Sequence, residues 1–374
     1  MGKHDRSNDT QSVDIYSSAK REKKAAKKGK KNKRSKTQKI IITILSVLVG
    51  FCILVSGLLI FALNYFDYNK TDLDEDLLGA QLDDSEDHVK NIALFGIDTR
   101  NQESMTGLSD SIMIMSIDSK AKTIKLVSIM RDSVVRVNGK VNKINSAYST
   151  GGHERAIKTL NENFGLDITD YATVNFSGMI GLIDMVGGVE AEVTKNEFYR
   201  ATAYGSLNDL IKEQAKLMGL KNPELVDAPG KQMLTGIQAV AWSRIRMQAT
   251  AEGERDDYGR TARQRHVLKE LFSRAANMSV TKYPKFIKKL LPYVETSLSY
   301  KEIIKLAPAI KGGTLESERI PYENTLICGY TGVSAGLYYN LDYASELIKG
   351  FIYDGKTFET YVAENPIDKT PWIE

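Results

Sequence analysis

An uninterrupted apolar run near the N-terminus restricts this chain more than any other feature of its sequence. Ile40–Leu63 (IIITILSVLVGFCILVSGLLIFAL) holds 24 residues without a charged side chain. About 20 apolar residues in a helix span the roughly 30 Å core of a bilayer. A cleaved signal peptide is the rival interpretation, but its apolar region is only about 7–15 residues long and a small-residue cleavage site follows it. Here Asn64, Tyr65 and Phe66 follow. We therefore expect residues 40–63 to form an uncleaved transmembrane helix, a signal anchor.

The charge of the chain divides at this run. Residues 1–39 contain 14 Lys and Arg against four Asp and Glu, whereas the remainder is slightly acidic. Basic residues beside a membrane helix stay on the cytoplasmic side and are attracted to anionic lipid. We expect 1–39 to be a cytoplasmic tail, 64–89 to be an acidic extracellular stalk, and the body to lie outside the cell membrane. Nucleic-acid binding by the tail is the weaker alternative, because the membrane would separate the tail from the acidic body.

Strand and helix patterns alternate beyond the stalk, which is typical of a layered α/β domain. Apolar and β-branched runs predict strands at 91–95, 111–117, 123–130, 172–176 and 189–194, with a hairpin turn at 118–120. Helical spacing is present at 154–164, 177–186, 235–242, 257–276, 283–293, 300–310 and 343–352. Residues 195–230 are polar and lack clear periodicity, so we expect an irregular excursion there.

Arginine is concentrated in one short stretch of the body. Six arginines lie within it: Arg244, Arg246, Arg255, Arg260, Arg263 and Arg265. Guanidinium groups form bidentate bonds with phosphate and carboxylate, so an anion site is one interpretation. A solvated basic face with salt bridges is the other. Residues 243–246 follow a predicted helix and read as extended, which would place Arg244 and Arg246 on one side of the chain.

The helix predicted at 257–276 has one stripe that is polar at its start and apolar toward its end. Asp257, Arg260 and Gln264 share this stripe with Val267 and Leu268. Polar groups on an inward-facing stripe need partners. A buried salt bridge would supply them, and so would an anionic ligand, and spacing alone favours neither.

Two carboxylates and an arginine fall at the ends of predicted strands. Asp98 follows the first strand, Asp110 precedes the second and Arg131 ends the third. If the first two strands are neighbours, the two acids meet at one edge of the sheet and, with phosphate oxygens and waters, suit Mg²⁺. Asp98 as a simple turn former is the alternative. Ligands of open α/β sheets bind outside the carboxyl ends of the strands, which Asp98 and Arg131 fit.

Seven blocks between residues 91 and 268 resemble, in order and spacing, the LytR–CpsA–Psr family of bacterial cell-wall proteins. The blocks are NIALFGIDTR (91–100), SDSIMIMSID (109–118), SIMRDS (128–133), KINSAYSTGG (143–152), VNFSGMIGLIDMVGGVEAEV (174–193), LTGIQAVAWSRIR (234–246) and DYGRTARQRHVL (257–268).

The resemblance implies an α/β fold, namely an α-β-α sandwich around a central mixed β-sheet, held outside a Gram-positive bacterial cell by a single N-terminal transmembrane helix. We expect the catalytic domain at 90–325 and a C-terminal segment, 326–374, that packs on this domain or extends it. Family members transfer glycopolymers, such as teichoic acid or capsular polysaccharide, from polyprenyl pyrophosphate to peptidoglycan through a phosphodiester bond. The implied protein is a transferase of cell wall biogenesis whose partners are the polyprenyl-linked glycopolymer, peptidoglycan and the lipid bilayer.

The resemblance also implies residue roles. Asp98 and Asp110 match the acids associated with Mg²⁺. Arg131, Arg244, Arg246 and Arg260 match the arginines that bind the pyrophosphate of the carrier, and Asp257 and Gln264 match the polar pair flanking the last of them. The chain departs from the pattern at Leu108, where many members have arginine, and at Met130, where many have proline. The loss of one arginine would weaken the grip on phosphate or change the preferred donor.

Several alternatives stay open at this point. Asp257 is either the general base or a residue that orients Arg244 or Arg260, and an aspartate kept ionised by arginines is a poor base, which favours orientation. A polyprenyl-pyrophosphate pyrophosphatase would use the same residues with water as acceptor. A non-catalytic envelope regulator would use the same anion pocket, although binding alone would not require the Asp98–Asp110 metal site.

Overall fold

The computed structural model describes residues 73–74, 78–80, 88–99, 105–203, 205–277, 293–299, 301–303, 305–306, 313–327 and 332–372. Asp67–Glu374 form one compact unit. The predicted tail, the predicted transmembrane helix at 40–63 and most of the stalk lie outside the described residues, as do most of the helices predicted at 283–293 and 300–310. Among the helices that can be described, none is both long enough and apolar enough to cross a bilayer.

The centre of the unit is a six-stranded mixed sheet with the strand order β10-β3-β2-β1-β6-β9. Its strands are β1 (Val89–Asp98), β2 (Leu108–Asp118), β3 (Thr123–Ile129), β6 (Asp170–Asn175), β9 (Val294–Thr296) and β10 (Thr314–Ile320). The pairs β1–β6 and β3–β10 are parallel, and the pairs β1–β2, β2–β3 and β6–β9 are antiparallel. The mixed sheet and the predicted 118–120 hairpin are confirmed, whereas β9 and β10 were not predicted.

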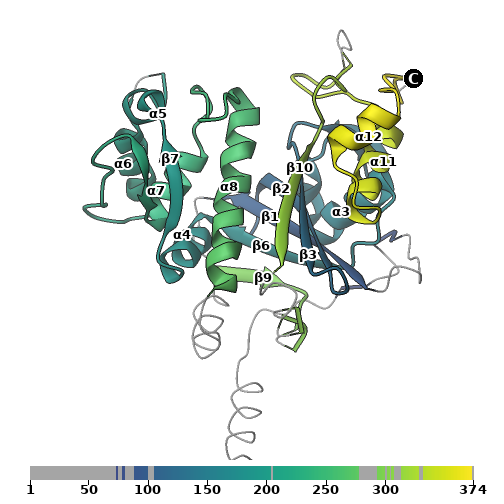
Figure 1. Ribbon diagram of the computed structural model, residues 1–374, viewed down its shortest axis with the longest axis horizontal. Coiled ribbons are helices and arrows are strands. Elements are labelled where there is room, and N and C mark those ends of the chain that lie inside the picture. Colours follow the sequence, from purple (N-terminus) through teal and green to yellow (C-terminus); the bar gives the residue numbers. More distant parts are fainter. Residues whose placement is uncertain are drawn as a thin grey trace, which may run out of the picture. The chain divides into compact units, whose positions relative to one another are not determined.

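Helices cover both faces of this sheet, which confirms the predicted α-β-α layering (Figure 1). On one face, α3 (Ser146–Phe164) and α11 (Leu341–Ile352) pack into a core with Phe95, Ile114 and Val127. On the other face, Leu268 and Phe272 of α8 (Asp256–Ala276) pack against a second core that includes Ile92 and Met113. Because both faces are covered, Ile112–Ile117 of β2 are buried without alternation.

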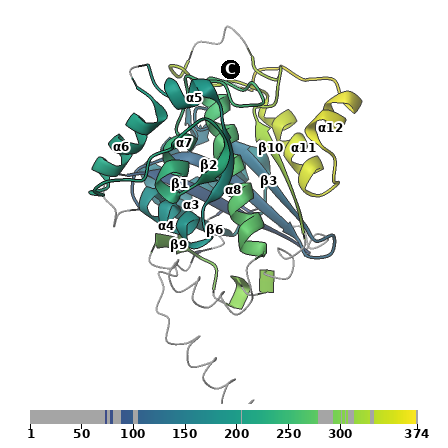
Figure 2. The same ribbon diagram turned by 60° about the vertical axis from the view of Figure 1, so that its left-hand side comes forward.

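A smaller lobe packs beside the sheet at the α8 side (Figure 2). It contains β7 (Val189–Val193), β8 (Gly230–Leu234), α4 (Phe176–Met185), α5 (Lys195–Tyr199), α6 (Leu207–Leu217) and α7 (Gly236–Ser243) around its own apolar core. The prediction of an irregular excursion at 195–230 is wrong for α5 and α6. Both helices begin with a capping box, Thr194 with Glu197 and Ser206 with Asp209, which supplies partners for backbone groups that a helix leaves unpaired at its start.

The remaining elements lie outside the central sheet. They are the hairpin of β4 (Val134–Val137) and β5 (Lys140–Lys143), and α12 (Phe358–Glu364).

Gly151 and Gly152 have non-helical dihedral angles inside α3, so the regular helix resumes at His153, close to the predicted start at residue 154. Phe351 and Phe358, from α11 and α12, are buried in the same core as β1, so the C-terminal segment contributes to the domain interior.

Candidate functional site

The candidate site lies at the edge of the sheet where several strands end together. Strands β1, β3 and β6 run in one direction, because β1 is parallel to β6 and is separated from β3 by the antiparallel β2. Their carboxyl ends carry Asp98, Arg131 and Asn175, and all three side chains line one cavity. The three side chains thus gather at the edge where open α/β sheets bind their ligands.

A β-bulge lies beside the two predicted acids. Gly96 pairs with Ser111, but the next residue, Ile97, pairs with Ser109, so Asp110 is the extra residue of the bulge. A bulge re-aims the side chain of its extra residue. Asp98 ends β1 opposite Leu108, and Asp98 and Asp110 both line the cavity. The predicted neighbourhood of these acids is therefore present.

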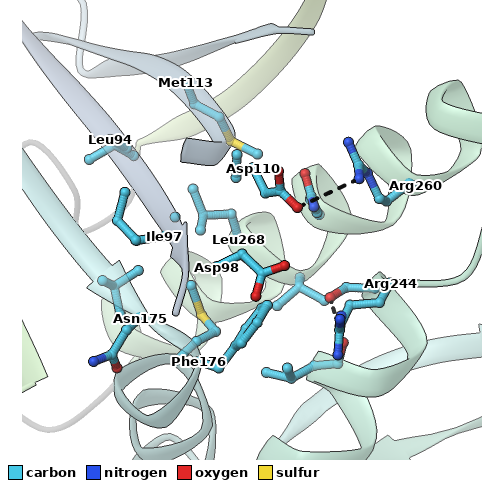
Figure 3. Close-up of a pocket in the computed structure, with 18 of the residues that line it drawn as sticks. Leu94, Ile97, Asp98, Asp110, Met113, Asn175, Phe176, Arg244, Arg260 and Leu268 are labelled. Atoms are coloured by element: carbon cyan, nitrogen blue, oxygen red, sulfur yellow. Dashed lines mark hydrogen bonds and ion pairs between the residues drawn. The ribbon is translucent and has the colours of Figure 1, made fainter. Parts of the chain in front are cut away.

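Asp110 is held by arginines on two sides. Nη1 of Arg131 donates a 2.7 Å hydrogen bond to Oδ1 of Asp110. Nη1 of Arg260 lies 4.0 Å from Oδ2 of Asp110 (Figure 3). Burial opposes the charged form of Arg131, but the hydrogen bond and charge of Asp110, with the charges of Asp257 and Asp132, outweigh burial and raise the pKa of Arg131. Arg131 is therefore a permanent cation at this edge.

Asp257, in the first turn of α8, is surrounded by three arginines. Its carboxylate accepts a 2.8 Å hydrogen bond from Nη2 of Arg260, and it lies 3.3 Å from Nε of Arg246 and 3.7 Å from Nε of Arg131. Burial is the main reason that the pKa of Arg260 falls to about 10, and the nearby charges of Arg131 and Arg246 add to it. Arg260 therefore stays charged at neutral pH. The polar stripe of α8 therefore combines the two alternatives: its side chains form a salt bridge with one another, and they also line the cavity.

Arg244 differs from the other three arginines of the site in its partners. It ends α7 with helical dihedral angles (φ −94°, ψ −8°), so the predicted extended conformation of 243–246 is wrong at this residue. Its Nη1 donates to Oε1 of Gln214 on α6, and its guanidinium lies 4.9 Å from the ring centroid of Phe176. Asp257 therefore pairs with Arg246 and Arg260, and not with Arg244.

The arginine-rich stretch contains both cavity-lining and structural residues. Arg244, Arg246 and Arg260 line the cavity. Arg263 is 1% exposed and pairs with Glu197 at 2.6 Å, and it donates to the carbonyl oxygens of Ile245 at 2.8 Å and Gln248 at 2.7 Å. It thereby fixes the backbone that carries Arg246.

The cavity is amphipathic and has a volume of about 720 Å³. Its charged end holds Asp98, Asp110 and the four arginines, and Gln264 also contributes to the wall. Ser111, Asn175, Thr202 and Ser243 add polar groups. Most of the remaining wall is apolar and includes Leu94, Met113, Met115, Ala172, Val174, Phe176, Met179, Leu182, Leu210, Val240, Val267, Leu268, Leu271, Phe272, Ala275 and Val294. Figure 3 shows Asp98 and Asp110 on the same side of the cavity as Arg244 and Arg260, with Leu94 and Ile97 across from them. This lining suits a ligand that combines an anionic group with an apolar body.

Phe176 lines the cavity, Gln214 binds Arg244 and Glu197 pairs with Arg263, and none of the three was predicted from the sequence. The sequence did contain a helix-start signal for α5, which carries Glu197, and for α6, which carries Gln214. The patterns Thr-x-x-Glu at 194–197 and Ser-x-x-Asp at 206–209 are capping-box signatures, and they mark the starts of α5 and α6. Nothing in the local sequence indicated that Gln214 would reach Arg244 across the lobe.

The donor set suits a cation that retains water. Asp98 and Asp110 supply carboxylate oxygens to one space, and the described residues contain no cluster of three or more His, Cys, Asp or Glu side chains suited to a metal. Mg²⁺ is bound in many sites by one or two carboxylates, with waters and substrate phosphates completing the octahedron. The two acids therefore fit Mg²⁺ only together with ligand oxygens.

Comparisons with known proteins agree with this geometry. The chain matches the LytR_cpsA_psr family over residues 61–344. It is 30% identical over 60% of its length to the polyisoprenyl-teichoic acid–peptidoglycan teichoic acid transferase TagV of Bacillus subtilis, and the match spans only 54% of that relative. The crystal structure of B. subtilis TagV superposes with a TM-score of 0.53 at 26% identity, covering 71% of this chain and 97% of that one. YwtF (TagT) of B. subtilis, solved with bound octaprenyl pyrophosphate lipid, has a TM-score of 0.50 at 22% identity and covers 73% and 92% of the two chains, a likeness of fold.

Proposed function

The chain belongs to the LytR_cpsA_psr family, and from this we propose that it transfers an anionic glycopolymer from a polyprenyl-pyrophosphate carrier to peptidoglycan. The polymer would be of the teichoic acid or capsular polysaccharide type, and the bond formed would be a phosphodiester. The name of the relative TagV states the teichoic acid and peptidoglycan chemistry for that protein.

The amphipathic cavity is the observation that carries this proposal. A polyprenyl pyrophosphate joins two phosphates to a long apolar chain, and one cavity here joins four arginines to a wall of aliphatic and aromatic side chains. Guanidinium groups match phosphate oxygens in charge and geometry. The TagT structure with bound octaprenyl pyrophosphate shows that a protein of this fold accommodates such a lipid.

The proposed reaction is a direct phosphoryl transfer. A sugar hydroxyl of peptidoglycan attacks the sugar-proximal phosphorus, a new P–O bond forms, and the bond to the lipid-side phosphate breaks. Arg131, Arg246 and Arg260 hold the two phosphates in line and offset their charge, which is most of what phosphoryl transfer requires from a protein. The leaving group is polyprenyl phosphate, and the hydroxyl proton passes to solvent or to Asp257.

Asp98 and Asp110 would hold Mg²⁺ beside these arginines. When bound, the ion would neutralise charge that develops on the phosphate oxygens. Asp257 orients Arg260 and Arg246 in this scheme, because its carboxylate already binds both guanidinium groups. Gln264 lines the same wall and is available to the phosphate oxygens or to the acceptor.

We further propose that residues 40–63 anchor the chain in the cell membrane with residues 1–39 in the cytoplasm. The anchor would keep the transferase beside a carrier lipid that cannot leave the bilayer. This orientation rests on the basic residues before the apolar run.

Reconstitution with the full-length chain tests the proposal. The chain is given a synthetic polyprenyl-pyrophosphate glycan and peptidoglycan oligomers, with Mg²⁺ or with a chelator, and the products are identified by mass spectrometry. We expect a metal-dependent glycan–phosphate adduct of peptidoglycan that is lost in Arg131→Ala and retained in Arg274→Ala, a surface control outside the cavity. Release of lipid phosphate without an adduct would indicate a pyrophosphatase. Donor binding without turnover would indicate the non-catalytic role.

A further inference from the structure

The charges of the site are unevenly compensated. Arg131, Arg246 and Arg260 each form at least one salt bridge with Asp110 or Asp257. Within the part of the chain that the structure describes, Arg244 forms none. Its polar partner is the neutral amide of Gln214, and its other contact is the ring face of Phe176.

Neutral partners orient a guanidinium without neutralising it. A carboxylate partner would form an ion pair with Arg244, and a phosphate would then have to compete with that carboxylate for the same charge. An amide oxygen accepts one hydrogen bond and leaves the net charge in place. A ring face attracts the cation through its quadrupole and likewise adds no charge.

Gln214 is buried beside Arg244, where it can do this. It lies on α6 and is 2% exposed, whereas its neighbours Lys212 and Glu213 are exposed. Burying an amide requires a hydrogen-bond partner, and the guanidinium of Arg244 supplies one to its oxygen. Helix α6 packs against α7, the helix that Arg244 ends, so the amide and the guanidinium come from two elements held together by the lobe core.

We propose that Gln214 is the positioning residue that fixes Arg244 at the cavity while leaving its charge free for the phosphates of the ligand. The proposal rests on the proposed function, because it assigns Arg244 to the pyrophosphate of the carrier lipid. It adds a requirement on charge: residue 214 must be both a hydrogen-bond acceptor and neutral.

Three substitutions separate these two requirements. Gln214→Glu keeps an acceptor of the same shape but pairs Arg244 with a carboxylate. Gln214→Met keeps the length of the side chain and removes the acceptor. Lys212→Gln changes the net charge of α6 by the same amount as Gln214→Glu, at a side chain that is 57% exposed, and serves as the matched control.

Binding of two probes to the full-length chain provides the test. The probes are octaprenyl pyrophosphate and the uncharged octaprenol, and thermal unfolding confirms that each variant folds. We expect Gln214→Glu to weaken octaprenyl pyrophosphate binding by about 10-fold or more, the effect of losing one charge-assisted contact. Octaprenol binding should stay within about 2-fold of wild type, since the apolar wall is unchanged. Gln214→Met should weaken pyrophosphate binding less than Gln214→Glu, and Lys212→Gln should behave as wild type.

Any of the following results would contradict the inference. Wild-type affinity in Gln214→Glu would show that the charge of Arg244 is not needed. If Gln214→Met weakened pyrophosphate binding more than Gln214→Glu, the hydrogen bond of Gln214 would matter and its neutrality would not. Equal losses for octaprenol and octaprenyl pyrophosphate would mean that residue 214 serves only the lobe fold. If the wild-type chain itself bound octaprenol as tightly as octaprenyl pyrophosphate, the proposed function would fail first.

Discussion

At the scale of single residues, Arg260 and Arg263 show how partners decide the role of a buried cation. Both lie on α8 and are nearly inaccessible, at 4% and 1% exposure. Arg263 pairs with the buried Glu197 and with two backbone carbonyls, so all of its charge is satisfied inside the protein. Arg260 shares Asp257 and Asp110 with other arginines and faces the cavity. An anion in the cavity can therefore contact Arg260, whereas Arg263 does not line the cavity.

Asp257→Asn distinguishes orientation from general-base catalysis. The substitution keeps an oxygen that accepts from Arg260, but removes the charge that holds Arg246. We expect transfer activity to fall by roughly 10-fold through misplaced arginines, compared with the about 100- to 10,000-fold that a general base contributes. Steady-state rates of the full-length chain measure this, with Asp132→Asn as a control that also borders Arg131. A loss beyond 1,000-fold (the order expected of a base) would contradict the orienting role.

The same residues show what sequence reasoning could and could not provide. The resemblance and the strand patterns correctly placed Asp98, Asp110 and Arg131 at one edge of the sheet, because a strand ends where its apolar run ends. The partners of Arg244 could not be predicted from the sequence. Gln214 lies 30 positions earlier in the chain, in a segment without clear periodicity, and its contact with Arg244 depends on how α6 packs against α7.

At the scale of elements, the strength of the local signal decided which were predictable. Strands β1, β2 and β3 are long and buried on both faces, so their apolar runs are conspicuous. Strand β9 has three residues. Strand β10 reads TLESERI, and exposed and half-buried positions alternate over its first four residues before it ends in two buried ones. Such short or polar edge strands exist because a neighbouring strand offers hydrogen bonds, which is tertiary information.

Glycines of α4 provide a matched test of how closely this element packs. A Cβ at Gly178 would lie 2.5 Å from the carbonyl oxygen of Tyr293, whereas one at Gly181 would lie 3.7 Å from the Tyr293 ring, an ordinary contact. We expect Gly178→Ala to lower the free energy of unfolding by about 1–3 kcal/mol through overpacking. Gly181→Ala should leave it unchanged or raise it by up to about 1 kcal/mol, since alanine favours helix. Urea unfolding measures both, and equal effects would contradict the close approach of α4 to residue 293.

At the scale of the whole molecule, Glu295 joins three separate parts of the chain. It lies on β9, accepts a 2.9 Å hydrogen bond from the Tyr171 hydroxyl on β6, and lies 3.1 Å from Nδ1 of His153 on α3. The hydrogen bond with His153 is the largest cause that lowers the pKa of Glu295 below its ordinary 4.5, and burial opposes it. A lowered folded-state pKa stabilises the fold above the unfolded value and loses this effect as pH falls through the folded value.

Glu295→Gln should therefore remove part of the pH dependence of stability. We expect the wild type to be more stable than the variant at pH 7. The difference should begin to shrink near pH 4.5, where Glu295 of the unfolded chain takes up a proton, and should be lost as the pH falls through the lower pKa of the folded state. Denaturant unfolding of both proteins across this range gives the difference directly. Lys158→Gln, a change at an exposed α3 residue, controls for a general charge effect. A difference that stays constant down to pH 3 would contradict the role of the ionised carboxylate.

The two ends of the cavity must act together on one ligand if the proposed function is right. Arg260 and Ala275 both line the cavity from α8 and are 15 residues apart, which at 1.5 Å per residue is about 22 Å along the helix. Ala275→Trp should fill the apolar end without touching the arginines. We expect it to weaken octaprenyl pyrophosphate binding by about 10-fold while geranyl pyrophosphate, too short to reach residue 275, binds within about 2-fold of wild type. Ser273→Trp, on an exposed face of the same turn, should change neither affinity. Equal weakening of both lipids by Ala275→Trp would contradict this prediction. It would mean that the far end of the octaprenyl chain does not bind near residue 275 and that the chain leaves the arginines by another path.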